Sequence, residues 1–200
     1  MKAVQERSQK TRLKIIQTAL ELFHQQGVNA TSVDEILEKS GKGKSQFYYY
    51  FKTKDDLIHA VVQNFYENLR SKKLPIKYDI ETWDDLEQWF AFFINFQKST
   101  NCSRGCPMAT IGYELTPDQE LIRQDINLIF EFTKNSLSRF FHGLKAKGKL
   151  KKSADPDALA DFCFSIMQGG MITSKIRKET APFEHAVSHA IAYLKSLRVQ

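Results

Sequence analysis

The sequence is poor in cysteine and has no long apolar run. Its three cysteines, Cys102, Cys106 and Cys163, are an odd number without paired clusters of zinc ligands, so neither a secreted disulfide framework nor a structural metal site is expected. No segment reaches the roughly 18 apolar residues of a membrane span, and the polar, basic start has no signal-peptide pattern. These absences predict a cytoplasmic protein with no metal and no membrane partner.

Recognisable catalytic patterns are also missing. The sequence contains no Ser/His/Asp order, no phosphate-binding glycine loop and no metal-ligand helix. Among its histidines only His185 and His189 share a helix face, and they lack the glutamate of a zinc protease motif. We therefore expect a protein that is not an enzyme and needs no cofactor.

The net charge of +6 is concentrated in the first quarter of the chain. Residues 1–54 hold ten lysines and arginines against five acidic residues, whereas residues 55–200 hold nineteen against eighteen. A basic region joined to a nearly neutral one favours a polyanion as the partner of the basic region. A basic surface that only aids solubility gives the same count, so charge alone leaves both interpretations open.

Apolar residues recur at helical spacing almost throughout, and no run alternates as a strand does, which predicts an all-α fold. Gly27 and Gly41 are placed to stop the first two helices. Ser32 and Thr53 are placed as N-caps, each with an acidic residue three positions later. The predicted helices span about 8–26, 32–41, 44–51, 53–70, 82–99, 107–115, 118–147, 156–178 and 183–197.

Two short helices joined by a glycine-containing turn lie between residues 32 and 51, after the longer first helix. Helices of about eight residues are not stable alone, so both must pack on the first helix, through apolar residues that include Ile36, Phe47 and Phe51. This arrangement predicts a helix-turn-helix. Its second helix carries donors and aromatic rims that suit phosphates and base edges.

The stretch from Thr11 to Leu57, TRLKIIQTALELFHQQGVNATSVDEILEKSGKGKSQFYYYFKTKDDL, resembles the DNA-binding domain of the TetR/AcrR family of bacterial transcriptional regulators. The likeness covers the order of helix, glycine turn, capped helix, glycine and aromatic-rich helix. It implies that the helix at 44–51 enters the major groove and that the start of the next helix contacts the phosphate backbone. The residues assigned to DNA binding are Ser32, Lys42, Lys44, Ser45, Gln46, Tyr48, Tyr49, Tyr50, Lys52 and Lys54.

Several of these assignments have a second interpretation. Lys42 stands where the family usually has a small apolar residue, so its stem either covers the corner or its ammonium reaches a phosphate. Tyr50 is expected to face the first helix in part, which leaves Tyr48 and Tyr49 as the better DNA candidates. Lys52 is either a contact or a solvated charge, whereas Lys54 lies at a helix N-terminus, which also favours a phosphate.

One helix-turn-helix offers few base contacts, so specificity calls for two copies on a roughly palindromic site. The last two predicted helices carry small and apolar residues, among them Gly169, Gly170, Ala186 and Ala190. The family resemblance implies that these helices form the interface of a homodimer. An intramolecular core has a similar composition.

The helices between are rich in aromatic residues, which fits either a plain core or a cavity. The resemblance implies a small-molecule pocket there, for an inducer that the sequence does not identify. The candidate ligand-binding residues are Trp89, Phe93, Phe96, Cys106, Met108, Tyr113, Phe130, Met167, Gln168 and Met171.

Cys106 supports an alternative function. The segment NCSRGCPMATIGYEL resembles a turn of one TetR subgroup, and Cys106 lies at the N-terminal end of a predicted helix, which favours a thiolate. A redox- or electrophile-sensing repressor that acts through Cys106 is therefore one alternative. The other interpretation of this residue is a buried structural cysteine.

Together these features predict a helix-turn-helix DNA-binding domain over residues 1–54, a linking helix over 55–70, and a ligand-binding and dimerisation domain over 71–200. The expected function is a repressor that a small-molecule inducer releases from double-stranded operator DNA. A helical protein-interaction scaffold without DNA binding is a further alternative, but it leaves the basic first quarter unexplained.

Overall fold

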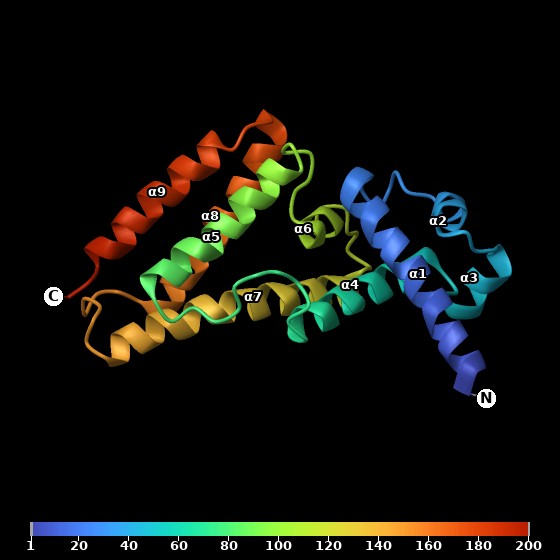
Figure 1. Ribbon diagram of the computed structural model, residues 1–200, viewed down its shortest axis with the longest axis horizontal. Coiled ribbons are helices and arrows are strands. Elements are labelled where there is room, and N and C mark those ends of the chain that lie inside the picture. The colour runs from blue at the N-terminus through green and yellow to red at the C-terminus, as the bar shows by residue number, and fades with distance from the viewer. Residues whose placement is uncertain (1, 200) are drawn as a thin grey trace. The chain divides into compact units, whose positions relative to one another are not determined.

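The computed structural model describes residues 2–199, and Figure 1 traces its elements. Over these residues the fold is all-α, as the sequence predicts, and the only β pairing is an isolated bridge between Leu150 and Arg198. No helix of this described range is both long enough and apolar enough to cross a membrane. The helices are α1 (Lys2–Gln26), α2 (Val33–Ser40), α3 (Lys44–Tyr50), α4 (Lys54–Arg70), α5 (Trp83–Ser99), α6 (Pro107–Gly112), α7 (Glu120–Ala146), α8 (Pro156–Arg177) and α9 (Ala181–Ser196).

Local chemistry places most helix ends within a few residues of where the sequence predicts them. The Ser32 hydroxyl caps α2 by accepting a backbone N–H at 3.1 Å. Gly41 ends the same helix in the left-handed conformation, with φ at 66°, which a residue with a Cβ adopts only at a cost. Thr53 caps α4 in a reciprocal arrangement with Asp56, and Thr82 caps α5 in the same way.

The first helix differs from its prediction. It begins at Lys2 rather than at residue 8. Helical spacing predicts one buried stripe on this helix, made of Leu13, Ile16, Ala19, Leu20 and Phe23. Leu13 is instead 40% exposed. Ile15 and Leu22 are buried, although the predicted stripe omits them. The reason is that α1 packs against α2, α3, α4 and α6, and a helix with neighbours on several sides buries more than one stripe.

The described chain forms two compact units. One comprises the residues up to Lys73 together with Pro107–Leu128, and the other comprises Leu74–Cys106 together with the residues from Ile129 onward. Residues 107–128 belong by chain position to the predicted 71–200 domain, but they pack with the N-terminal unit. The long helix α7 therefore contributes its first turns to one unit and the rest to the other.

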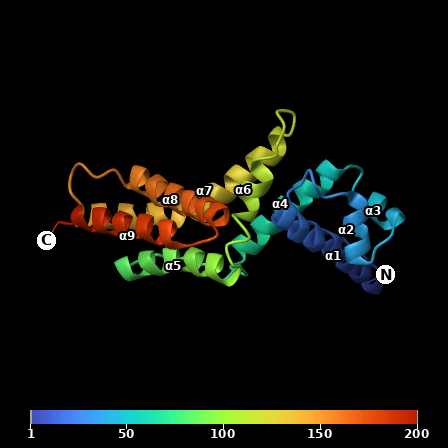
Figure 2. The ribbon, with the colours of Figure 1, turned by 90° about the horizontal axis from the view of Figure 1, so that it is seen from above.

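Each unit has its own apolar core. In the N-terminal unit, α1 supplies Ile16 and Phe23, and α2 and α3 supply Ile36 and Phe47, all of them buried. In the C-terminal unit, α8 and α9 lie side by side (Figures 1 and 2) and enclose a core with α5 and the second part of α7. That core contains Trp89, Phe90, Leu137, Phe140, Phe141, Cys163, Met167, Met171, Phe183 and Leu194.

Candidate nucleic-acid interface

The helix-turn-helix consists of α2, a short turn and α3, both packed on α1. Gly41 and Lys42 close the end of α2 through backbone bonds to Glu38 O and Leu37 O at 3.2 and 3.0 Å. At the start of α3, the Gln46 side chain turns back and accepts a hydrogen bond from the Gly43 N–H at 3.2 Å. These bonds fix the turn, so the direction of α3 is set by the corner itself.

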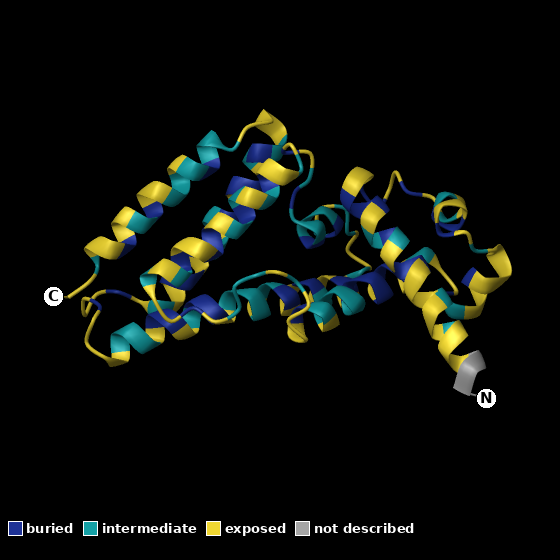
Figure 3. Cartoon of the chain, in the orientation of Figure 1, coloured by how far each residue is buried: buried dark blue, intermediate teal, exposed yellow. Residues whose placement is uncertain are grey.

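One face of α3 is buried and the other is presented to solvent (Figure 3). Phe47 is only 1% exposed, and its ring centroid lies 5.5 Å from that of Phe51, which is also buried. Tyr48 and Tyr49 are 61% and 78% exposed. We call the exposed residues of α3 the α3 face; they are Lys44, Ser45, Gln46, Tyr48 and Tyr49.

Tyr50 is directed to the protein rather than to the α3 face. Its hydroxyl donates to Ser8 O at 3.0 Å and lies 2.8 Å from Ser8 Oγ, so it ties the end of α3 to the start of α1. Tyr50 is half-buried, and the sequence predicts that its ring faces the first helix in part. Its hydrogen bonds support a role in holding α3 in place, so that the α3 face is presented in a fixed orientation.

The lysines near α3 differ in their surroundings. Lys44 Nζ lies 2.9 Å from Asp34 Oδ1 on α2, and this hydrogen-bonded pair raises the pKa of Lys44. Lys42 is half-buried, whereas Lys52 is exposed at the turn before α4. Lys54 donates from Nζ to Val28 O at 2.6 Å, and burial lowers its pKa. Lys44 and Lys52 are therefore exposed, whereas Lys42 and Lys54 are half-buried and the Lys54 ammonium already holds a backbone carbonyl.

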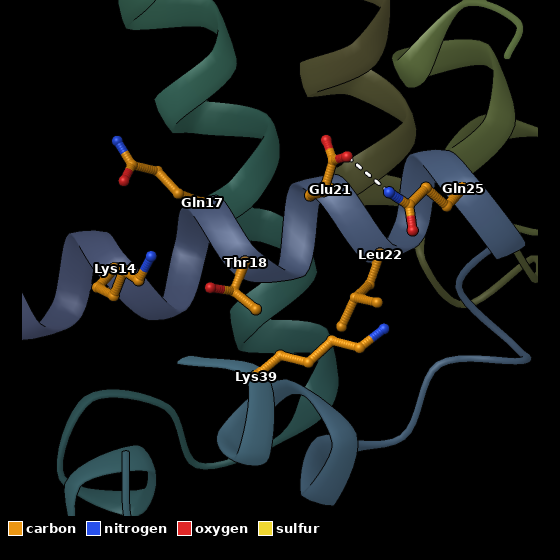
Figure 4. Close-up of a pocket in the computed structure, with 7 residues that line it drawn as sticks. All are labelled: Lys14, Gln17, Thr18, Glu21, Leu22, Gln25 and Lys39. Atoms are coloured by element: carbon orange, nitrogen blue, oxygen red, sulfur yellow. Dashed lines mark hydrogen bonds between the residues drawn. The ribbon is translucent and has the colours of Figure 1, made fainter. Parts of the chain in front are cut away.

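A surface pocket lies elsewhere on this unit, over α1 and the end of α2 (Figure 4). It contains none of the residues assigned to DNA binding, and Glu21 Oε1 accepts a 2.6 Å hydrogen bond from Gln25 within it. The pocket is open to solvent, and all but one of its lining residues are polar or charged, unlike the enclosed sites lined by apolar side chains that small ligands prefer. Its lining residues are Lys14, Gln17, Thr18, Glu21, Leu22, Gln25 and Lys39.

The candidate ligand-binding residues divide between the two units. Met108 and Tyr113 belong to the N-terminal unit, where Met108 is buried and Tyr113 is 71% exposed. The structure therefore does not gather them with the rest within one unit. The others lie in the C-terminal unit: Trp89, Phe93, Met167 and Met171 are buried, and Phe96, Cys106, Phe130 and Gln168 are half-buried.

Two contacts organise the half-buried members of this group. The Phe130 ring packs against Phe164 of α8, with 5.1 Å between centroids. Gln168 Nε2 donates to Cys106 Sγ at 3.6 Å, which joins α8 to the residue before α6. By contrast, Cys102 and Cys163 are buried, and burial raises the pKa of Cys163 to about 12. Cys106 is thus the thiol nearest to solvent.

Sequence reasoning missed two buried polar atoms in the C-terminal unit. Gln97 of α5 and Ser174 of α8 are fully buried, and no described residue hydrogen-bonds to Gln97 Oε1 or Ser174 Oγ. The Gln97 amide does donate to Arg104 O at 2.8 Å. An unsatisfied buried polar atom costs about 1–3 kcal/mol, so both atoms are candidate anchors for a polar ligand. The sequence feature that indicates a buried polar group here is the glutamine at the end of the aromatic run WFAFFINFQ.

Comparison with known proteins identifies the family. A family model described as "Bacterial regulatory proteins, tetR family" matches residues 15–61. A second, described as "Tetracyclin repressor-like, C-terminal domain", matches residues 83–190, which is more than half of the chain. The chain belongs to the TetR family. The resemblance inferred from Thr11 to Leu57 is thereby confirmed, and this TetR-family protein is a helix-turn-helix transcriptional regulator.

Curated relatives cover most of the chain at low identity. The transcriptional repressor DhaR of Mycobacterium sp. (strain GP1) is 23% identical over 175 residues, 86% of each chain. The transcriptional repressor ComR of Escherichia coli (strain K12) is 26% identical over 159 residues, 78% of this chain and 76% of its own. Both names describe repressors of transcription.

Solved structures share the fold of this TetR-family protein. A TetR transcriptional regulator from Chloroflexus aurantiacus aligns with a TM-score of 0.80 at 20% identity, over 98% of this chain and all of its own. The regulatory protein TetR from Rhodobacter sphaeroides aligns with a TM-score of 0.79 at 22% identity, over 94% of this chain and 98% of its own. The likeness extends over both units of the chain.

Proposed function

We propose that this TetR-family protein is a repressor that binds a palindromic operator as a homodimer and is released by a small-molecule inducer. The observation that carries the proposal is the α3 face, where Tyr48 and Tyr49 are exposed on a helix whose buried face is fixed to α1. Exposed hydroxyls, an amide and ammonium groups on a fixed helix suit base edges and phosphates in the major groove. Operator binding assigns the protein to the cytoplasm, where bacterial DNA lies.

Selection of bound duplexes from a random DNA pool tests the proposal. We expect a palindromic consensus whose half-sites lie about one helical turn apart, because two recognition helices of a dimer read successive major grooves. Affinity for that duplex should fall steeply with salt, since lysines supply much of the contact. A protein that enriches no sequence over the starting pool contradicts the proposal and favours the protein-interaction scaffold.

An exposed apolar stripe on α8 supports the homodimer. Ala158, Phe162, Ser165, Gly169, Ile172 and Ile176 are all exposed and follow each other at spacings of four and three, which is the pattern of a helix seam. A Cβ added to Gly169 meets nothing within 4 Å, so another helix can approach closely there. The Tyr193 ring of α9 extends this surface beside Phe162, with 5.6 Å between centroids.

Sedimentation of matched variants tests this interface. Ile172→Asp introduces a charge into the α8 stripe, and we expect it to shift the protein from dimer to monomer and to abolish operator binding. The control is Asn95→Asp, which adds the same charge at an exposed position of α5. A dimer that persists in Ile172→Asp contradicts the assignment of the interface to α8.

The interior of the C-terminal unit supports binding of a small ligand. Its aromatic and methionine side chains suit an apolar body, and the unsatisfied Gln97 Oε1 and Ser174 Oγ each suit a hydrogen-bonding group of a ligand. We therefore propose an inducer with an apolar framework and at least one hydrogen-bond donor. Gln97→Leu should keep operator affinity and lose release by the inducer, while Gln88→Leu at an exposed position of α5 should keep both.

A redox- or electrophile-sensing repressor is the second candidate, because Cys106 is the thiol nearest to solvent. Alkylation of Cys106 would also displace the Gln168 amide from its sulfur. If this candidate holds, N-ethylmaleimide releases operator from the wild type and not from Cys106→Ser. Unchanged operator binding by the alkylated wild type removes this candidate and leaves the inducer proposal standing.

A further inference from the structure

The loop between α1 and α2 is held by two charged side chains that come from other parts of the N-terminal unit. Lys54, the first residue of α4, donates from Nζ to Val28 O at 2.6 Å. Glu114, just beyond α6, accepts from the Asn29 N–H at Oε2, also at 2.6 Å. The Val28 carbonyl and the Asn29 N–H belong to one peptide group. A cation and an anion therefore bind opposite ends of the same peptide dipole.

This arrangement is self-reinforcing. An ammonium on the carbonyl oxygen and a carboxylate on the N–H both increase the dipole of the peptide between them, so each bond strengthens the other. Both bonds involve a full charge, which makes them stronger than neutral ones. Burial lowers the pKa of Lys54 while the nearby charge of Glu114 acts to raise it. The ammonium is thus partly withdrawn from water and directed at the loop.

Gly27 shows how closely Glu114 approaches the loop. Its φ of 90° lies in the region that favours glycine, and a Cβ built on it would overlap Glu114 Oε1. The Gly27 carbonyl accepts a 2.6 Å hydrogen bond from the hydroxyl of Thr31, near the other end of the loop. The carboxylate therefore rests against bare backbone, at a position where any other residue would displace it.

The segment that carries Glu114 is joined to the same unit at further points. Met108 and Ile111 of α6 are each 1% exposed, and α6 packs on α1. Beyond Glu114, Gln119 Nε2 donates to Asp55 Oδ1 of α4 at 2.8 Å. Gln63 of α4 donates to Asp125 Oδ1 of α7 at 2.7 Å. Glu114 is the member of this set that contacts the loop leading directly into α2.

We propose that Glu114 is a positioning residue for DNA binding, and that Lys54 acts with it across the Val28–Asn29 peptide instead of serving as a phosphate ligand. The inference rests on the proposed operator binding. Together the two side chains fix the loop before α2 relative to the start of α4, and so fix the helix-turn-helix between them. The family resemblance implied a DNA contact for Lys54, so the two roles can be separated by experiment.

The first test is the operator affinity of the full-length Glu114→Ala variant, measured with the duplex selected by the wild type. Removing a negative charge from a DNA-binding unit should leave binding unchanged or tighten it if only electrostatics matters. Positioning predicts the opposite: an affinity lower by about 5-fold or more, the low end of coupling between sites. Glu67→Ala removes an equally negative, exposed side chain from α4 and serves as the control.

Lys54→Met supplies the second test. A lost phosphate contact lowers the slope of log affinity against log salt by about one unit. A lost positioning contact lowers affinity and leaves that slope unchanged. The double variant Lys54→Met/Glu114→Ala should then bind no more weakly than the weaker single variant, because both changes break one bridge. Additive losses with a reduced slope overturn the inference.

The Asn29 amide gives a readout that does not depend on DNA. Its proton resonance should move upfield in Glu114→Gln, which keeps a neutral acceptor, and also in Lys54→Met, although that residue does not touch the amide. If Glu114→Ala fails to fold, this resonance and the operator affinity of Glu114→Gln decide the question. A wild type that selects no operator defeats the proposed function, whereas a wild type that binds alongside a Glu114→Ala that binds equally well defeats only this inference.

Discussion

Two aromatic-rich helices of this TetR-family protein, α3 in the N-terminal unit and α5 in the C-terminal unit, place their rings differently: α3 leaves two rings in solvent, and α5 leaves none exposed. In the N-terminal unit Tyr48 and Tyr49 are 61% and 78% exposed, whereas Trp89 and Phe90 of the C-terminal unit are fully buried. Burying a side chain of the size of phenylalanine contributes about 1.5–3 kcal/mol, so a pair of rings left in water marks a surface kept for a partner. Composition alone does not distinguish exposed rings from buried ones, because α3 and α5 are both rich in aromatic residues. The positions of the aromatic residues around each helix do distinguish them.

The largest expected effect comes from comparing the two faces of α3. Phe47→Ala removes a ring that is 1% exposed and should lower the free energy of unfolding by about 3–5 kcal/mol. Tyr49→Ala on the α3 face should change it by no more than about 0.5 kcal/mol but weaken operator binding by about 1–3 kcal/mol. Urea unfolding and operator titration of both variants measure this. A stable Phe47→Ala, or a Tyr49→Ala with full affinity, would remove the distinction between the faces.

The sequence predicted the features that depend on neighbouring residues. The hydroxyls of Ser32 and Thr53 cap α2 and α4 as expected, because a cap is satisfied by the first turn of its own helix. The burial of Phe47 and the exposure of Tyr48 likewise follow from the helical period. These features required no knowledge of the rest of the fold.

Features set by distant residues could not be predicted. Residues 107–128 pack with the N-terminal unit although they are far from it in the chain, and no local sequence pattern predicts this contact. For the same reason the position of Lys54 at a helix N-terminus, which predicts a phosphate ligand, did not predict the contact of its ammonium with Val28 O. The orphaned Oε1 of Gln97 and its burial depend on how α5 packs, which the aromatic run does not specify.

Two adjacent glycines on α8 test the comparison of buried and exposed faces inside the C-terminal unit. A Cβ on Gly170 would overlap the Phe183 ring, so Gly170→Ala should lower the free energy of unfolding by about 1–3 kcal/mol. A Cβ on Gly169 meets nothing, and Gly169→Ala should be neutral or stabilising by up to about 1 kcal/mol within one chain. Thermal unfolding of the pair, each combined with Ile172→Asp so that the dimer contact at Gly169 does not contribute, measures the difference, and equal midpoints would contradict it.

The smallest expected effect concerns the caps of α4 and α5, which match in the two units except for one cation. Lys77 Nζ lies 2.7 Å from Asp85 Oδ1 of the α5 cap. This hydrogen bond, with those from the Glu81 and Thr82 backbone, holds the pKa of Asp85 well below its usual range. Because the folded state binds this proton less readily than the unfolded state, the contribution is complete above the usual aspartate pKa and is lost as pH falls below it.

Asp85→Asn removes that titration. The urea midpoint of the wild type should therefore fall further between pH 6 and pH 3 than the midpoint of Asp85→Asn, while Asp84→Asn, at an exposed neighbour, should behave as the wild type does. The difference should be modest, because the pair lies near the surface and solvent screens it. Parallel acid profiles for the wild type and Asp85→Asn would show that the Asp85 carboxylate at the α5 cap contributes no pH-dependent stability.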